Sequence, residues 1–213
     1  MDIKSQITKV LQHYPELHFN QQKNTLEGTL EIDTNDFYTL LIDLTPWNKH
    51  FPRVYELGER IPNSIDRHVY EAGNCCFTTP RLEEILLKTK IKTIAQFMQH
   101  ILIPYLQNNS YYELHKHYIN GEFSHSNSTQ ETYQTLLDTT DNVLILKVLF
   151  EYIKGNKLSH KDRCYCGSGK TLRKCANGNH KRGYDMLQYI DIIHLKKDVL
   201  ILNNELEEIL KAH

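Results

Sequence analysis

Residues 26–44 read LEGTLEIDTNDFYTLLIDL, and this stretch decides the fold class. Apolar or small residues recur at every second position from Leu26 to Ile32 and again from Tyr38 to Leu44. Asp33–Asp36, which lies between the two runs, consists of residues that favour turns. The pattern predicts two antiparallel strands joined by a short turn.

Helices and a third strand are expected on either side of this hairpin. Apolar residues at helical spacing predict a helix over residues 3–14, which Pro15 ends. A further extended piece is expected at 54–57, after the Phe51-Pro52 step. Because the strands precede the later helices and do not alternate with them, the predicted class is α+β and not a parallel doubly wound sheet.

The rest of the chain is expected to be irregular loop and then helix. Residues 58–80 have no clean periodicity and predict a long structured loop, and residues 108–128 have no periodicity either. A helix begins near Thr93, and Pro104 should kink or end it. Further helices are expected over 130–138, over 142–154 with Gly155 as the C-terminal cap, and over 184–212.

Length and composition exclude several classes of protein. The chain has 213 residues, of which 40 % are hydrophobic and 24 % charged, as in globular proteins. No apolar run approaches the ~18–20 residues of a membrane helix, and the N-terminus lacks the apolar core of a signal peptide. We therefore expect a cytoplasmic protein with no membrane partner. Two domains are predicted, over residues 1–155 and 156–213.

Positive charge is concentrated in one short segment, although the formal net charge of the chain is only −1. Residues 154–182 hold nine Lys or Arg and a single acid, Asp162. Such a segment is either a solvated basic face or a surface that docks to an acidic protein surface or to nucleic acid, and both interpretations stay open. No ladder of aromatic residues accompanies the charges, so we do not expect a nucleic-acid partner.

Three of the five cysteines fall in the basic segment, within CYCGSGKTLRKC, which begins at Cys164. Cys164, Cys166 and Cys175 can supply thiolates to a Zn²⁺ ion. His180 can complete the tetrahedral set, with His160 as the alternative. Four protein ligands would make the site structural, because a catalytic zinc keeps one position open. Gly-Ser-Gly-Lys-Thr is not a phosphate-binding P-loop, because Cys164 stands where that motif needs a glycine.

This cysteine segment resembles the SEC-C motif, a small zinc-binding module of the pattern CxCGSGKxxxxC followed by a further Cys or His. The match runs through Cys175, and Ala176 stands where that family usually has its fourth ligand. The resemblance implies a small structural zinc module near the C-terminal end of the sequence, followed by a helix.

The other two cysteines, Cys75 and Cys76, lie in the predicted loop within HVYEAGNCCF, which begins at His68. With Phe51-Pro52 upstream, this arrangement resembles the ubiquitin-conjugating enzymes. In that family a helix, a strand meander and a Phe-Pro or Tyr-Pro step precede the loop with the nucleophilic cysteine. Aligning Gly73 with the family glycine places Cys76 at the nucleophile and His68 at the family asparagine. By alternation along an extended segment, Cys75 would point inward and Cys76 outward.

More closely, the chain resembles the divergent bacterial conjugating enzymes of antiphage operons, including CBASS-type systems. These have a histidine upstream of a glycine-cysteine element and a Gly-to-His segment after the crossover helix, echoed by GEFSH at 121–125. The resemblance implies a conjugating-like α+β core that carries an acyl group as a thioester on Cys76 and transfers it to an amine. The implied partner is a modifier-like protein or the operon's cyclic-nucleotide synthase, a nucleotidyltransferase. Because the sequence has no Rossmann-type glycine loop, either a separate activating enzyme or an unusual activated donor is also needed.

The residue types suit acyl transfer. A thiolate is the nucleophile in such a reaction, and a positioned donor stabilises the developing oxyanion by ~2.7–4 kcal/mol in known acyl-transfer sites. His68 is expected either to be that donor or to assist as a base. The competing hypothesis is a catalytically inactive conjugating-like adaptor that binds its partner through the basic zinc module.

Overall fold

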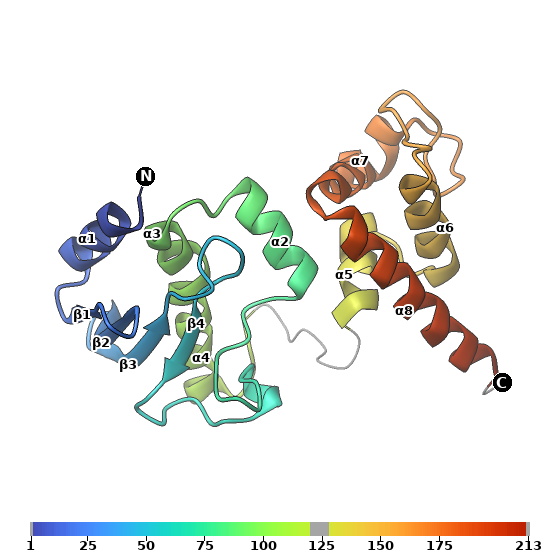
Figure 1. Cartoon of the computed structure of the whole chain (residues 1–213). Coiled ribbons are helices and arrows are strands. Elements are labelled where there is room, and N and C mark those ends of the chain that lie inside the picture. Colours follow the sequence, from blue (N-terminus) through green and yellow to red (C-terminus); the bar gives the residue numbers. More distant parts are fainter. Residues whose placement is uncertain (1, 120–127, 212–213) are drawn as a thin grey trace. The chain divides into compact units, whose positions relative to one another are not determined.

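The chain forms two compact units in the computed structural model, which describes residues 2–119 and 128–211 (Figure 1). Within those ranges, residues 2–78 and 86–119 make the first unit, and residues 79–85 and 128–211 make the second. The fold is α+β, as predicted, with an antiparallel sheet in the first unit and helices in both. Each unit has its own cluster of buried apolar side chains.

The sheet of the first unit is a meander in which consecutive strands are neighbours. β2 (Thr25–Asp33) and β3 (Asp36–Asp43) form the predicted hairpin, and β4 (Arg53–Glu56) pairs with β3 as the expected third strand. β1 (Leu17–Asn20) pairs with β2 and is an addition to the prediction. Its four residues are too few for an alternating pattern to stand out in the sequence.

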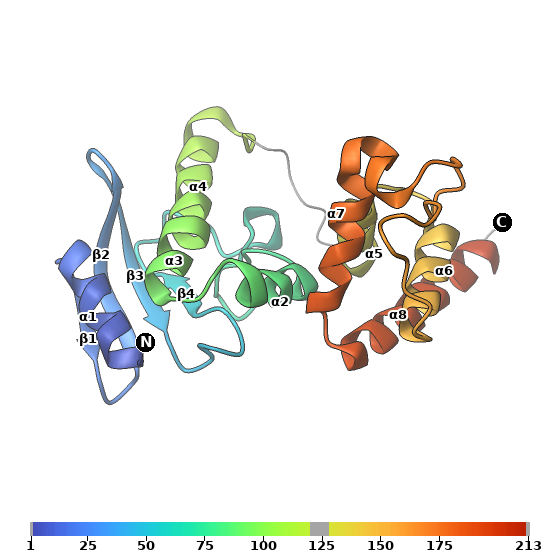
Figure 2. The ribbon, with the colours of Figure 1, turned by 90° about the horizontal axis from the view of Figure 1, so that it is seen from above.

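One face of this sheet is buried under helices. Leu26 pairs with Ile42 and Leu30 with Tyr38 across the hairpin, and all four side chains are fully buried. Their cluster also contains apolar side chains of α1 (Ile3–His13), α3 (Ile94–Phe97) and α4 (Ile103–His115). The Tyr38 hydroxyl donates to a main-chain carbonyl of α4 at 3.2 Å, and α4 runs alongside the sheet (Figure 2). The likeness of this core to the conjugating enzymes stays a prediction.

Pro104 neither ends nor breaks the helical stretch of the first unit. A π-helical turn, Met98–Leu102, connects α3 to α4, so the chain stays helical from Ile94 to His115. Pro104 lies in the first turn of α4, directly after the π turn, where the loss of one backbone N–H is tolerated. The expectation of irregular chain from residue 108 onward is therefore wrong as far as His115.

The second unit is built from helices, and α8 packs across α5 and α6 (Figure 1). The helices predicted over 130–138 and 142–154 are confirmed as α5 and α6, and Gly155 follows α6 with a φ of +92°. The single terminal helix predicted over 184–212 is instead two helices, α7 and α8. The bounds are α5 (Ser128–Leu137), α6 (Asn142–Ile153), α7 (Asn179–Met186) and α8 (Ile192–Lys211).

The predicted boundary between residues 155 and 156 lies inside the second unit. Tyr133 of α5 and Leu149 of α6 precede that boundary, whereas Leu187 and Leu195 follow it, and all four are fully buried in one cluster. The helices on either side of residue 155 therefore share a core, and α5 and α6 belong to the same unit as the cysteine segment.

The first half of α2 (Pro80–Thr89), which was not predicted, joins the second unit through buried polar contacts. Arg81 donates to both carboxylate oxygens of Asp198 at 2.6 and 3.0 Å, and the Tyr133 hydroxyl donates to the same carboxylate at 2.6 Å. The Asp198 side chain is only 2 % exposed. Its charge is thus compensated inside the unit, as a buried carboxylate requires.

Across residues 2–119 and 128–211, no helix combines the length and the apolar character that crossing a bilayer requires. The GEFSH segment at 121–125 lies outside the described residues.

Candidate metal centre and candidate nucleophile

Cys164 and Cys166 lie at the tip of a short hairpin between α6 and α7. The Cys164 amide donates to the Lys170 carbonyl at 2.9 Å, and Arg163 forms a β-bridge with Thr171. Gly167 and Gly169, with φ values of +74° and +75°, adopt the left-handed conformation that only glycine enters without strain. The Gly-Ser-Gly sequence therefore allows the reversal that returns the chain toward Cys175.

His180 reaches the cysteines through a second reversal. Ala176, Asn177 and Gly178 all have positive φ, at +45°, +53° and +86°, so the chain turns sharply just after Cys175. His180 follows in the first turn of α7. Ala176, at the position where the SEC-C family usually has its fourth ligand, is thus part of the turn that brings His180 to the cysteines.

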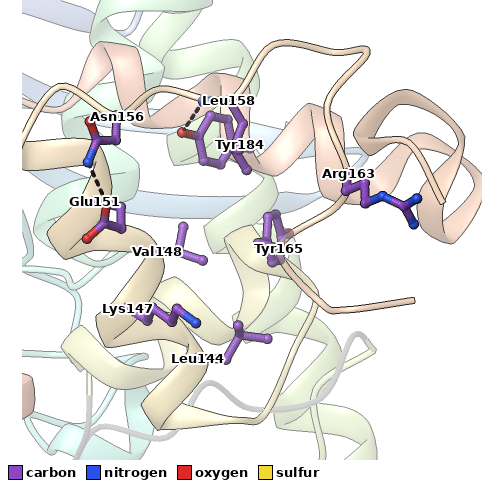
Figure 3. Close-up of a pocket in the computed structure, with 9 residues that line it drawn as sticks. All are labelled: Leu144, Lys147, Val148, Glu151, Asn156, Leu158, Arg163, Tyr165 and Tyr184. Atoms are coloured by element: carbon purple, nitrogen blue, oxygen red, sulfur yellow. Dashed lines mark hydrogen bonds between the residues drawn. The ribbon is translucent and has the colours of Figure 1, made fainter. Parts of the chain in front are cut away.

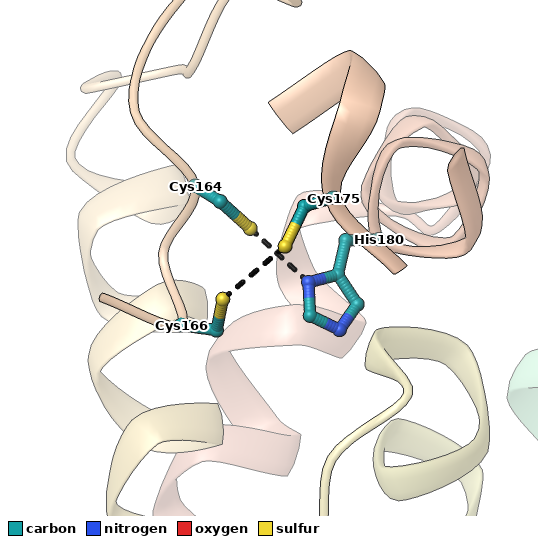
Figure 4. A group of neighbouring side chains, drawn as sticks. All are labelled: Cys164, Cys166, Cys175 and His180. Atoms are coloured by element: carbon teal, nitrogen blue, oxygen red, sulfur yellow. Dashed lines mark hydrogen bonds between the residues drawn. The ribbon is translucent and has the colours of Figure 1, made fainter. Parts of the chain in front are cut away.

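The four side chains converge on one point. The Cys164 sulfur lies 3.1 Å from Nδ1 of His180, and the Cys166 and Cys175 sulfurs lie 3.4 Å apart. All four ligand atoms lie within 4.8 Å of one another and point inward (Figure 4). Tetrahedral zinc with ordinary Zn–S and Zn–N bonds would separate its ligands by about 3.5–3.8 Å. The group can therefore hold a metal ion after small adjustments.

Surrounding residues fix the orientation of the His180 ring. Its Nε2 lies 3.3 Å from the carbonyl oxygen of Asp138, and a carbonyl only accepts hydrogen bonds. Nε2 is therefore assigned the proton, which leaves the Nδ1 lone pair directed at the thiols. Tyr165 stacks on the imidazole at 5.0 Å and donates its hydroxyl to the Leu137 carbonyl. The candidate ligand is thus held by α5 as well as by its own helix.

Three buried or half-buried thiols beside one imidazole form a donor set that could hold a metal ion. Burial raises the pKa of Cys164 to about 12. Burial also acts against ionisation of Cys166, but hydrogen bonds from Ser168 and the neighbouring thiols lower its pKa to about 6. The donor set is soft and suits a thiophilic metal. His160, the alternative ligand, is exposed and does not belong to the cluster among the described residues.

Cys75 and Cys76 lie on extended backbone that pairs with two other segments. Cys75 forms a β-bridge with Val69, and its amide donates to the Val54 carbonyl of β4 at 2.8 Å. The Cys76 amide donates to the His68 carbonyl at 2.7 Å. The predicted alternation follows: Cys75 is buried in the core of the first unit, and Cys76 on the opposite side is only half-buried.

The side-chain neighbour of Cys76 is Tyr70. Burial raises the pKa of the Cys76 thiol, and a hydrogen bond with the Tyr70 side chain opposes that rise. The His68 ring packs edge-to-face on Tyr118 at 5.1 Å, and the His68 carbonyl also accepts from the Tyr105 hydroxyl at 2.9 Å. The predicted pair, Cys76 and His68, is thus joined through the main chain.

Tyr70 and Tyr105 are site residues that the sequence analysis missed. Tyr70 lies two residues after His68, and the turn closed by the Gly73 amide on the Tyr70 carbonyl was a local signal that could have found it. Tyr105 forms a hydrogen bond with the Cys75 side chain. Because it lies in α4, far from Cys75 in the sequence, no local pattern predicts this contact.

No family model, curated protein or solved structure matches the chain. The resemblances to the conjugating enzymes and to the SEC-C motif therefore rest on the quoted sequence motifs alone.

Proposed function

We propose that the first unit is an acyl carrier of the ubiquitin-conjugating type and that Cys76 is its nucleophile. The observation that carries the proposal is the placement of the cysteine pair. The loop holds Cys75 in the core and leaves Cys76 half-exposed beside a hydroxyl group, at the position that the motif assigns to the nucleophile.

The reaction has two steps. The Cys76 thiol loses its proton, and the sulfur attacks the carbonyl carbon of a donor C-terminus already activated as a thioester or an acyl adenylate. A thioester forms, and the thiolate or nucleotide leaving group departs. An amine of the acceptor then attacks the same carbon, loses a proton and releases the Cys76 thiolate.

The rate of acyl transfer depends on the hydrogen-bond donors and bases next to the nucleophile. Because burial raises the pKa of Cys76, the thiol needs help to ionise, and the Tyr70 hydroxyl can donate to the thiolate once it forms. His68 serves as base or as oxyanion donor in this proposal. The acyl donor is a modifier-like protein or a CBASS-type nucleotidyltransferase, and it is either activated by a separate enzyme or is itself an unusual activated donor. The biological setting is antiphage defence.

Zinc is the proposed occupant of the cluster in the second unit. Three thiolates and one imidazole would fill all four positions of a tetrahedral Zn²⁺, which assigns the ion a structural role. When bound, the ion supplies positive charge that lets the buried thiols ionise.

The decisive experiment compares wild-type chain with Cys76→Ala, Cys76→Ser and Cys75→Ala, each isolated from cells that express the neighbouring genes. Intact mass and non-reducing gels, with and without dithiothreitol, report the adduct. Wild type and Cys75→Ala should form a thiol-labile adduct, Cys76→Ala none, and Cys76→Ser one that resists dithiothreitol. An adduct that depends on Cys75 and not on Cys76 would show that the assigned nucleophile is wrong.

The adaptor hypothesis is the second candidate function, and one observation favours it. Burial raises the pKa of both Cys75 and Cys76, whereas a nucleophilic cysteine usually has a lowered pKa. An adaptor would form no adduct, would tolerate Cys76→Ala without loss of biological activity, and would lose activity when Cys164 or Cys175 is replaced.

A further inference from the structure

A pocket of about 290 Å³ lies in the second unit, beside the hairpin that carries Cys164 and Cys166 (Figure 3). Its walls come from α6, from the segment that joins α6 to the hairpin, from Tyr165 between the two metal-ligand cysteines, and from Tyr184 of α7. None of the residues that line it belongs to the metal ligands or to the Cys76 loop.

The inner wall of the pocket is apolar and well supported. Tyr165 and Tyr184 stack with their ring centroids 6.2 Å apart, and Leu144 and Val148 of α6 line the same space. The Tyr165 hydroxyl donates to a main-chain carbonyl at 2.7 Å, and the Tyr184 hydroxyl accepts from the Leu158 amide at 2.9 Å. These bonds hold both rings in place, so the pocket is formed before anything binds.

Charged side chains lie at the rim of the pocket. Figure 3 shows Asn156, Glu151 and Lys147 on one side of the pocket and Arg163 on the other. The Glu151 carboxylate accepts a hydrogen bond from Asn156 at 2.6 Å and thus has a partner within the unit. Lys147 and Arg163 are exposed cations. Because Lys154 lies 3.5 Å from the Glu151 carboxylate and Lys147 also acts on it, the Glu151 charge is offset within the unit. The lysine and arginine side chains at the rim therefore attract a negatively charged ligand group.

We propose that this pocket binds an acidic segment of a partner protein. One apolar or aromatic side chain of the segment inserts against Leu144, Val148 and the two tyrosine rings, and its flanking carboxylates lie on Lys147 and Arg163. The reaction at Cys76 is not required for this binding, which would serve a carrier and an adaptor alike.

Size and surroundings favour a protein segment over a free small molecule. The pocket is at the small end of the range for ligand sites and is open along one side, so it suits a single anchoring side chain. The attraction also extends beyond it, because residues 154–182 carry nine Lys or Arg against one acid. Such a field steers an acidic chain toward the surface and strengthens with falling salt.

Fluorescence anisotropy with the whole 213-residue chain, loaded with Zn²⁺, tests the proposal. Three labelled pentapeptides serve as probes: phenylalanine flanked on each side by two aspartates, alanine with the same flanks, and phenylalanine flanked by lysines. The first peptide should bind at least about tenfold more tightly than either of the others, because only it offers both the anchor and the charge.

Two matched pairs of variants locate the binding site. Leu144→Trp fills the pocket, whereas Val143→Trp places the same ring on the same helix at a position that is 62 % exposed and does not line the pocket. Arg163→Gln removes a charge from the rim, whereas Lys174→Gln removes one from an exposed position elsewhere in the basic segment. Leu144→Trp and Arg163→Gln should each weaken binding about tenfold, and the two controls less than about twofold. Metal content and circular dichroism confirm that each variant is folded.

Three outcomes would overturn the proposal. Equal affinity for the two acidic peptides would mean that the basic face binds without an anchor. Equal losses in Arg163→Gln and Lys174→Gln would mean non-specific attraction. The absence of saturable binding by the first peptide at low salt would mean that the pocket has no such ligand.

Discussion

The cysteines of the first unit lie side by side on extended backbone, whereas those of the second unit converge on a histidine from a hairpin tip and a sharp turn. Alternation along the chain separates Cys75 from Cys76, so one thiol is buried and its neighbour is half-exposed. Reversals at Gly167 and at Ala176 have the opposite effect and bring distant thiols together.

This difference shows that the local backbone decides what a cysteine can do. A thiol pair on a strand cannot share one ion, because neighbouring side chains point to opposite faces. Thiols brought together by tight turns can share one, and a bound cation would let the buried thiols ionise. The first arrangement leaves one of the two thiols partly accessible, and the second places four side chains where they could hold a metal ion.

Removal of a bound metal should reveal the largest difference in stability between the two units. Chelation, or His180→Ala, should unfold much of the second unit, because structural zinc sites contribute on the order of 10 kcal/mol to folding. Circular dichroism should then report a loss of helix. The first unit has the only tryptophan, Trp47, buried in its core, and its fluorescence should not change.

The matched controls for that experiment are His160→Ala and His180→Cys. Both should keep about one zinc per chain by elemental analysis, because His160 is exposed and a fourth thiolate can replace the imidazole. A protein that keeps its helix content after metal removal would contradict the structural role of the site.

The arginine–carboxylate ion pairs of the two units should contribute differently to the free energy of unfolding. Arg81→Met leaves the buried Asp198 carboxylate without its ion-pair partner. The change should lower the stability of the second unit by about 3–5 kcal/mol. Arg60→Met in the first unit removes half-exposed contacts with Asp36 and Glu113 and should cost about 1–2 kcal/mol. Urea unfolding followed by circular dichroism and by Trp47 fluorescence measures both values. Equal losses would contradict the difference in burial.

Glycine substitutions test how closely the helices of the second unit pack. A Cβ atom at Gly183 of α7 would lie 1.4 Å from the Leu136 carbonyl oxygen of α5, so Gly183→Ala should destabilise the unit by about 3 kcal/mol. At Gly155 a Cβ meets no atom within 4 Å, and only the positive φ opposes it. Gly155→Ala should therefore cost about 1 kcal/mol. Thermal unfolding of the two variants gives the comparison.

Thiol reactivity should give the smallest effect. Because burial raises its pKa, Cys76 should react with iodoacetamide more slowly than an exposed thiol at neutral pH, with a rate that still rises above pH 9. Tyr70→Phe removes a group that lowers this pKa and should slow alkylation by roughly threefold. Peptide mass mapping follows each site, and fast labelling of Cys75 in the folded protein would contradict its burial.

The buried Cys75 thiol also predicts a pH dependence of stability. Its pKa is raised by burial from about 9 to about 12, so the folded state keeps the proton that the unfolded chain loses. The free energy of unfolding should therefore fall as the pH rises from about 9 toward 12. Cys75→Ala should remove this component of the alkaline dependence.

Much of the fold follows from local patterns. The hairpin, α1, α5 and α6 each have a clear period and flanking turn or capping residues, so the sequence predicts them. β1 is too short to show a period, and α4 passes Pro104 because a π turn precedes it. The metal cluster is predictable because its spacing and glycines lie close together in the chain.

The sequence by itself determines the α+β class, the candidate metal ligands and the alternation of the Cys75–Cys76 pair, because each depends on neighbours along the chain. Only the tertiary structure decides that residues 79–85 join the second unit, that His180 and not His160 meets the thiols, and that Tyr105 contacts Cys75. These depend on buried contacts between residues far apart in the sequence, such as Arg81 with Asp198, and no local periodicity records them.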